Sequence, residues 1–182
     1  MIVYHGSLAK FEQFDASKMG LNGTSEGKGF YFTDTRHIAE GYGHNGYLYT
    51  VEFNGKKPLS DTTLTVTKPE LRKFLEALHK ETEYLSNWGE VDYSGFNQVM
   101  EDALAGELDS SENDVDLIAG ICNTSGNTGR ALELVYEVLG FDSIITTEAQ
   151  WGGEQTIYIA LVNDIIEIKE VLALESSEYK AE

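Results

Sequence analysis

Two tyrosines eleven positions apart, Tyr31 and Tyr42, are the residues best placed in this sequence to hold a flat ligand. Tyr31 lies in an apolar run, residues 30–33, which predicts a short strand, and Thr35 is expected to start a helix that carries Tyr42. Two glycines just before this strand allow the backbone to approach a bound group closely. Because aromatic faces offer a large apolar area, the two rings predict a sandwich around a planar ligand. Burial of both rings in the core is the alternative.

A polar triplet, His5-Gly6-Ser7, ends the first apolar run of the chain. The run predicts a strand, so His5 is expected near a strand end, beside a residue without a side chain. A neutral imidazole there can exchange a hydrogen bond with a sugar hydroxyl, and the backbone of Gly6 can pair with a carboxamide. Taken alone, His5 also fits a structural role; the triplet and the two tyrosines together favour a ligand site.

The chain resembles the catalytic domain of poly(ADP-ribose) polymerases and related diphtheria-toxin-type ADP-ribosyltransferases in residues 4–7, residues 27–32 and Tyr42. The eleven-residue step from Tyr31 to Tyr42 matches the spacing of that family's two nicotinamide-stacking tyrosines. The likeness is specific over residues 2–53, loose over the final forty and absent in between. It implies an α+β fold of split antiparallel β-sheets flanked by helices. Residues 1–174 would form a single domain with a helical insertion at about 68–139, followed by a polar tail, 175–182.

The resemblance also implies a chemistry, with NAD as co-substrate and no metal. His5 would orient the adenosine ribose, Gly6 and Ser7 would bind the dinucleotide, and Tyr31 and Tyr42 would stack on nicotinamide. The bond to be cleaved joins nicotinamide to ribose, and its cleavage passes through an oxocarbenium-like transition state. A carboxylate facing that ribose would stabilise the developing positive charge.

The third catalytic position departs from the family, which places a Glu where this chain has Ile157. One explanation moves the polar group upstream, to Gln155, which shares a strand face with Ile157, or to Glu154, with Glu148 a weaker candidate. A second leaves Ile157 in place, as in mono-transferring members, and a third is NAD binding without turnover. We favour the first. Ala39 replaces a serine that binds the nicotinamide amide in the polymerases, a loss of about 1 kcal/mol.

Composition narrows the classes of function. A length of 182 residues suits one domain, and a net charge of −18 with only three Arg argues against an independent nucleic-acid binder. The acidity serves either solubility or a basic partner. A single cysteine, Cys122, excludes an internal disulfide and a cysteine-rich metal site, and we expect it to be buried. We expect no signal peptide and no membrane span, and therefore a cytoplasmic protein.

Further elements follow from apolar spacing and turn residues. Phe11 and Phe14 are expected to anchor the segment after the first strand. The insertion should hold helices near residues 67–85, 96–104 and 131–139, the last ended by Gly140. Strands are expected at residues 47–53, 141–146, 155–162 and 165–172, with a loop at 147–153. The acidic stretch 101–116 is expected to be a solvated loop or a partner-facing patch.

These features favour a mono-ADP-ribosyltransferase that modifies a protein acceptor, which the acidic charge suggests is basic. Residues 154–158 also resemble small acidic transferases of phages, including anti-CRISPR proteins, which implies an effector acting in a host cytoplasm. Two alternatives stay open: an acidic inhibitor or decoy that occupies a basic nucleic-acid-binding protein, and a degenerate domain that only binds NAD.

Overall fold

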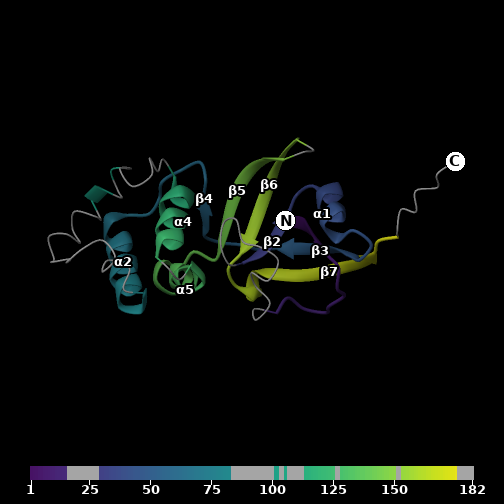
Figure 1. Ribbon diagram of the computed structural model, residues 1–182, viewed down its shortest axis with the longest axis horizontal. Coiled ribbons are helices and arrows are strands. Elements are labelled where there is room, and N and C mark those ends of the chain that lie inside the picture. Colours follow the sequence, from purple (N-terminus) through teal and green to yellow (C-terminus); the bar gives the residue numbers. More distant parts are fainter. Residues whose placement is uncertain are drawn as a thin grey trace.

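A computed structural model describes residues 1–15, 29–82, 101–102, 105, 113–125, 128–150 and 153–175 of the chain (Figure 1). Within these residues the strands form one seven-stranded sheet in the order β4-β5-β6-β2-β1-β3-β7. The strands are β1 (Ile2–Ser7), β2 (Phe30–Thr33), β3 (Tyr47–Phe53), β4 (Pro58–Ser60), β5 (Ser143–Gln150), β6 (Gly153–Ala160) and β7 (Ile166–Ala173). The helices are α1 (Arg36–Gly43), α2 (Lys68–Thr82), α4 (Asp114–Thr124) and α5 (Thr128–Leu134), which continues into a π-helical turn (Val135–Leu139).

The sheet divides in the middle, between β1 and β2. These two strands pair at a single position, Tyr4 opposite Thr33, whereas β1 with β3 and β2 with β6 pair along their whole registers. One half of the sheet is therefore β4-β5-β6-β2 and the other is β1-β3-β7. This confirms the split antiparallel architecture. The parallel pair of β4 and β5 was not expected, because three residues are too few to show an alternating pattern.

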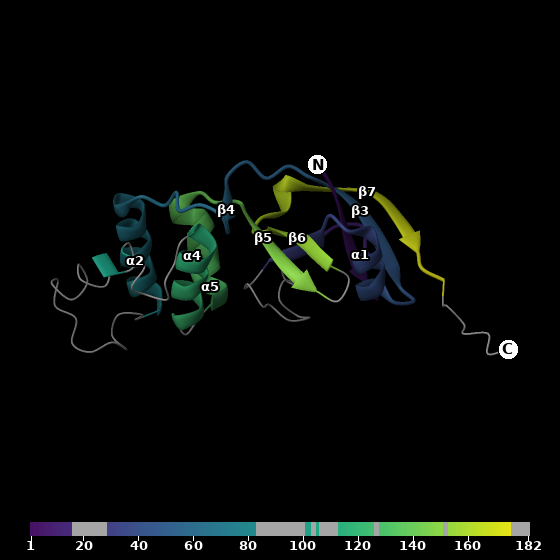
Figure 2. The ribbon, with the colours of Figure 1, turned by 90° about the horizontal axis from the view of Figure 1, so that it is seen from above.

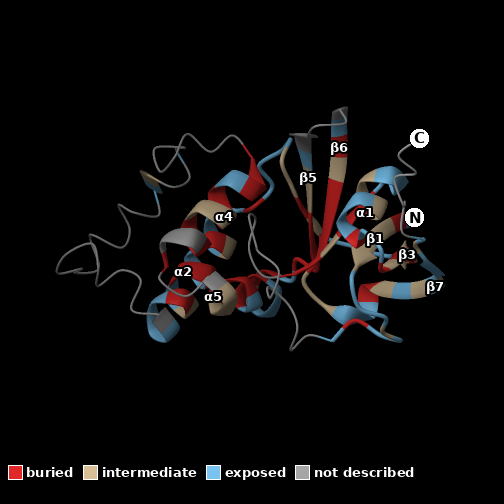
Figure 3. Ribbon diagram, turned by 45° about the vertical axis from the view of Figure 1, so that its right-hand side comes forward, coloured by how far each residue is buried: buried red, intermediate tan, exposed pale blue. Residues whose placement is uncertain are grey.

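Side chains alternate across the sheet, so each face has its own core. One face carries an aromatic core, made of Val3, Phe14, Phe30, Phe32, Tyr49, Val51, Phe53, Tyr158, Ala160 and Ile165. On the opposite face Ile157 and Ile159 of β6 belong to a second core that includes the helices. The views agree that α2, α4 and α5 gather beside β4 and β5, while α1 lies by β1 and β3 (Figures 1 and 2). Figure 3 shows β5 and β6 standing between the two groups.

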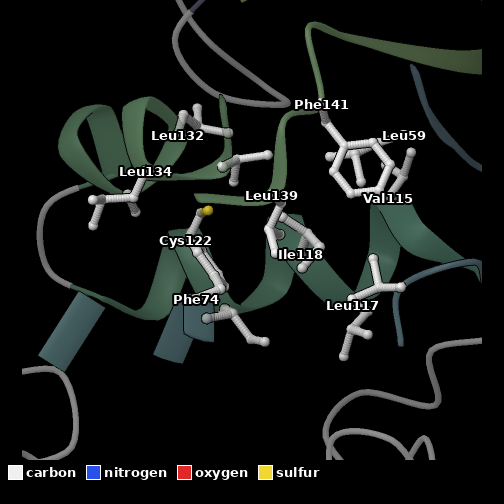
Figure 4. Packing of buried hydrophobic residues seen from close by; sticks show 14 of the residues in the cluster. Leu59, Phe74, Val115, Leu117, Ile118, Cys122, Leu132, Leu134, Leu139 and Phe141 are labelled. Carbon is white, nitrogen blue, oxygen red and sulfur yellow. The ribbon is translucent and has the colours of Figure 1, made fainter. Parts of the chain in front are cut away.

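The helices α2, α4 and α5 with the π-helical turn form a helical lobe inserted between β4 and β5. Its core packs Phe74 of α2 with Ile118 and Cys122 of α4 and with Leu139 (Figure 4). Thr67 begins α2 as expected, because its N–H and hydroxyl both donate to Glu70, which satisfies an otherwise unpaired helix end. Gly140 ends the third predicted helix with a left-handed φ of 72°. The helix predicted at 96–104 lies outside the described residues.

The structure corrects two expectations. The loop predicted at 147–153 is wrong for most of its length, since β5 continues to Gln150 and β6 begins at Gly153. The acidic stretch was expected to be solvated as far as Asp116, yet Asp114 is fully buried and starts helix α4. Its carboxylate accepts hydrogen bonds from the N–H and hydroxyl of Thr65 and from the N–H of Val66. These bonds fasten α4 to the segment that leads into α2.

Candidate functional site

His5 lies where β1 and β2 part. Its Nδ1 is 2.8 Å from the backbone oxygen of Tyr31, so the imidazole bridges the two strands just beyond their one paired position. Because a carbonyl oxygen can only accept, Nδ1 carries the proton in this contact and Nε2 keeps its lone pair. The side chain thus has one nitrogen committed to the fold and one that can accept a hydrogen bond.

Aromatic rings surround the imidazole on the face of the aromatic core. The ring centroids of Phe14 and Phe32 lie 5.2 and 5.8 Å from that of His5, and those of Tyr49 and Phe11 lie 6.0 and 6.1 Å away. Burial lowers the pKa of His5, and the hydrogen bond to the Tyr31 carbonyl opposes that effect only in part. His5 is therefore neutral at physiological pH, as a hydrogen-bond acceptor at Nε2 must be.

The segment after β1 is held over His5 by Tyr49. The Tyr49 hydroxyl accepts from the N–H of Phe11 at 2.7 Å and donates to the carbonyl of Ala9 at 3.1 Å. The rings of Phe11 and Tyr49 stack with centroids 4.1 Å apart. Burial raises the pKa of the Tyr49 phenol, so the hydroxyl stays protonated in this role. Phe11 and Phe14 are thus anchors, as the sequence predicts.

Gly6 is the point at which helix α1 rests on β1. A Cβ atom on Gly6 would collide with the carbonyl oxygen of Ala39 and the N–H of Gly43, both in the α1 backbone. Only glycine permits this approach. The next residue, Ser7, ends β1, and its Oγ accepts from the N–H of Ala9 at 3.2 Å. Gly6 therefore brings β1 against α1, and Ser7 caps the turn that follows the strand.

The two tyrosines reach this region from different elements. Tyr31 of β2 is half-buried and packs against the core of the helical lobe, and by strand alternation it shares the sheet face on which α1 lies. Tyr42 sits on α1 with 60% of its surface exposed. The His5 ring contacts the backbone of Tyr31, but it lies on the aromatic-core face of the sheet, whereas Gly6 and the Tyr31 ring lie on the face that α1 covers. Tyr42 belongs to the same helix as Ala39 and Gly43, whose backbone contacts Gly6. A nicotinamide sandwich between the two rings stays a prediction.

The candidates for the third position separate within β6. Glu154 is already in the strand and exposed, whereas Gln155 and Ile157 are 3% and 8% exposed and point to the opposite face, with Tyr31. Ile157 pairs with Thr33 and belongs to the core of the helical lobe. Strand alternation thus separates Glu154 from the face of Tyr31, and the choice of third residue stays a prediction. Glu148 pairs with Gln155 across the β5–β6 hairpin.

A residue that the sequence did not single out lies beside Gln155. The hydroxyl of Thr33 donates to Oε1 of Gln155 at 3.0 Å and accepts from the N–H of Thr35 at 3.1 Å. Thr33 is buried and stands two positions after Tyr31, so it shares the Tyr31 face. That period-two spacing after Tyr31 was the only signal in the sequence that could have found it.

A family model described as "ADP-Ribosyltransferase in polyvalent proteins" matches residues 1–171. The chain belongs to this family. Its membership confirms the resemblance to ADP-ribosyltransferases and supports ADP-ribosyl transfer as the general function. A search of curated proteins finds no match. A solved structure titled "Crystal structure of an anti-CRISPR protein" is similar at 18% identity, covering 92% of this chain and 94% of that one, with a TM-score of 0.41.

Among the described residues, no three His, Cys, Asp or Glu side chains come together as a metal-binding group. In the same part of the chain, no helix combines the length and the apolar character needed to cross a bilayer.

Proposed function

We propose that this ADP-ribosyltransferase domain transfers a single ADP-ribose unit from NAD to a side chain of a protein and releases nicotinamide. The observation that carries the proposal is the imidazole of His5, fixed on the Tyr31 carbonyl with Nε2 able to accept, in a chain of this family. Gly6 follows His5 directly in the sequence, and its backbone is the proposed partner of the nicotinamide carboxamide.

In the proposed reaction the bond between the ring nitrogen of nicotinamide and C1′ of its ribose breaks, and the electron pair leaves with nicotinamide. The acceptor side chain forms a new bond to C1′ and loses a proton. His5 would accept a hydrogen bond from the adenosine ribose, while Tyr31 and Tyr42 would hold the nicotinamide ring between their faces. Ile157 supplies no carboxylate to activate a ribose hydroxyl, which favours transfer of one unit over chain growth.

The test uses NAD labelled in its adenylate half and a cell lysate as the source of acceptors. His5→Ala, Tyr31→Ala and Tyr42→Ala should each abolish label transfer while the circular dichroism spectrum keeps its folded form. The matched control is Tyr136→Ala, because Tyr136 is 42% exposed on the helical lobe, away from β1 and α1. Full transfer by all three site variants would reject the proposed site.

A second pair of variants addresses the third position. Gln155→Ala and Glu154→Ala change neighbouring residues of β6 that point to opposite faces of the sheet. We expect Gln155→Ala to reduce nicotinamide release more than Glu154→Ala does. The reverse order would assign the role to Glu154 and would require β6 to be rearranged in the NAD complex.

Two other functions have one observation each in their favour. The net charge of −18 suits an inhibitor or decoy of a basic protein, and an effector acting on a host complex would use the same charge to find its acceptor. Tight binding to a basic protein that does not depend on NAD and weakens steeply with salt would identify the inhibitor.

Ile157 in place of a carboxylate suits a domain that binds NAD without turnover. Such a domain would be stabilised by NAD and release no nicotinamide.

A further inference from the structure

Gln155 is a buried amide with one hydrogen bond to its side-chain oxygen. Its Oε1 accepts from the Thr33 hydroxyl at 3.0 Å, and only 3% of the residue is exposed. Among the residues that the structure describes, no hydrogen-bond partner stands opposite its Nε2 group, which carries two N–H donors. Buried donors without a partner destabilise the folded state, and native structures rarely keep them without a function.

The orientation of this amide is determined by Thr33. The Thr33 hydroxyl already accepts from the N–H of Thr35 at 3.1 Å, so its own hydrogen is free to donate. In the structure that hydrogen is donated to Oε1 of Gln155, which directs the Gln155 nitrogen away from Thr33. The hydrogen bonds from Thr35 to Thr33 and from Thr33 to Gln155 link the start of α1, the end of β2 and the start of β6. They hold the Nε2 donor of Gln155 in one orientation.

This donor lies on the same sheet face as the ring of Tyr31, opposite to the imidazole of His5. Gln155, Thr33 and Tyr31 all point to the face of the sheet on which α1 packs. Gln155 lies two positions before Ile157, near the start of β6. An N–H donor fits an oxygen, and near a ring stacked on Tyr31 NAD would present its carboxamide oxygen, which is assigned above to Gly6, and the oxygens of the adjoining ribose. Because 3% of Gln155 is exposed, a covering side chain must move for that oxygen to arrive.

We propose that Nε2 of Gln155 donates a hydrogen bond to a hydroxyl oxygen of the nicotinamide ribose, and that Thr33 is the positioning residue that presents it. The inference rests on the proposed function and assigns the third position to a neutral donor in place of a carboxylate. A neutral N–H does not attract the positive charge that develops on the ribose, so it contributes to holding NAD more than to lowering the barrier. Its loss therefore raises KM for NAD more than it lowers kcat.

The experiment compares Thr33→Val with Thr33→Ser. Valine has nearly the shape of threonine and removes the hydroxyl, whereas serine keeps the hydroxyl and removes a methyl group. For Thr33→Val we expect KM for NAD to rise about 2- to 12-fold, the equivalent of one neutral hydrogen bond, with kcat within about twofold. Thr33→Ser should retain the KM of the unaltered protein. Equal KM values for the two variants would overturn the proposal.

A second measurement does not depend on either variant folding. In protein of unaltered sequence labelled with ¹⁵N and ¹³C, the side-chain amide signals of Gln155 should shift on addition of NAD, together with the ring signals of Tyr31. Movement of the Tyr31 signals with the Gln155 amide unchanged would overturn the role of Gln155 and leave the proposed function standing. No movement of either, with no nicotinamide released, would reject the proposed function and the present inference with it.

Discussion

The contact of Gly6 with α1 gives a sharp test of the geometry, because the helix offers its own matched control. In Gly6→Ala the new methyl group meets the backbone of Ala39 and Gly43 and none of their side chains, so no rotamer change can make room. An ordinary Cβ contact is 3.4 Å or longer, and both collisions fall about 1 Å or more short of it. Helix α1 must therefore move away from β1 and take Tyr42 with it.

The control is Gly41→Ala on the same helix, where a Cβ atom meets nothing within 4 Å. Alanine is the better helix former at an exposed site, so this variant should be as stable as the original or up to about 1 kcal/mol more stable. Gly6→Ala should lose about 1–3 kcal/mol, as overpacked sites do, which lowers Tm by roughly 2–12 °C for a chain of this size.

The functional consequence separates the two variants further. A displacement of about 1 Å in a substrate-holding element can cost on the order of 100-fold in rate. We expect Gly6→Ala to lose nicotinamide release to about that extent, measured at a temperature where it is fully folded, and Gly41→Ala to keep it. If Gly6→Ala retains both its Tm and its activity, α1 does not rest on Gly6 as the structure has it, and the proposed role of the helix that carries Tyr42 loses its support.

Three further predictions concern buried ionisable groups. Asp114→Ala leaves three donors without their acceptor and should cost about 3 kcal/mol or more in denaturant unfolding, against less than about 0.5 kcal/mol for the exposed Asp164→Ala. Burial lowers the folded-state pKa of His5 below its ordinary 6.5, so its contribution to stability is complete above pH 6.5 and is lost as the pH falls below it. The fall in Tm between pH 7.5 and 5.5 should shrink in His5→Gln, and an unchanged fall would place His5 in solvent. Burial raises the pKa of Cys122 to about 12, so Ellman's reagent at pH 8 should detect no thiol in the folded protein and one after denaturation.

Local patterns in the sequence predicted the elements that carry the site. The first apolar run located β1, which the structure extends past the expected end at His5 as far as Ser7, and strict alternation located β3 at the bounds the structure gives. Thr67 with Glu70, and Gly140, located a helix start and a helix end from capping chemistry alone. Each of these signals lies within a few residues of the feature it predicts, which is why no tertiary information was needed.

What the sequence could not supply depends on contacts between distant residues. Asp114 looks solvated among its acidic neighbours, and only Thr65 and Val66, nearly fifty positions away, bury it. The roles of Glu154 and Gln155 depend on where β6 begins, because one residue of shift exchanges the two faces of the strand. The hydrogen bond from Thr33 to Gln155 spans 122 positions and has no local signature.

The measurement that tests the central claim most directly compares two products of one reaction. Purified protein is incubated with NAD labelled in its adenylate half, and nicotinamide released is counted against label bound to acceptor protein. The account predicts that both appear at equal rates, one label for each nicotinamide, and that both vanish in His5→Ala. NAD that stays intact at an excess of folded protein, or release and labelling that persist in His5→Ala, would contradict it.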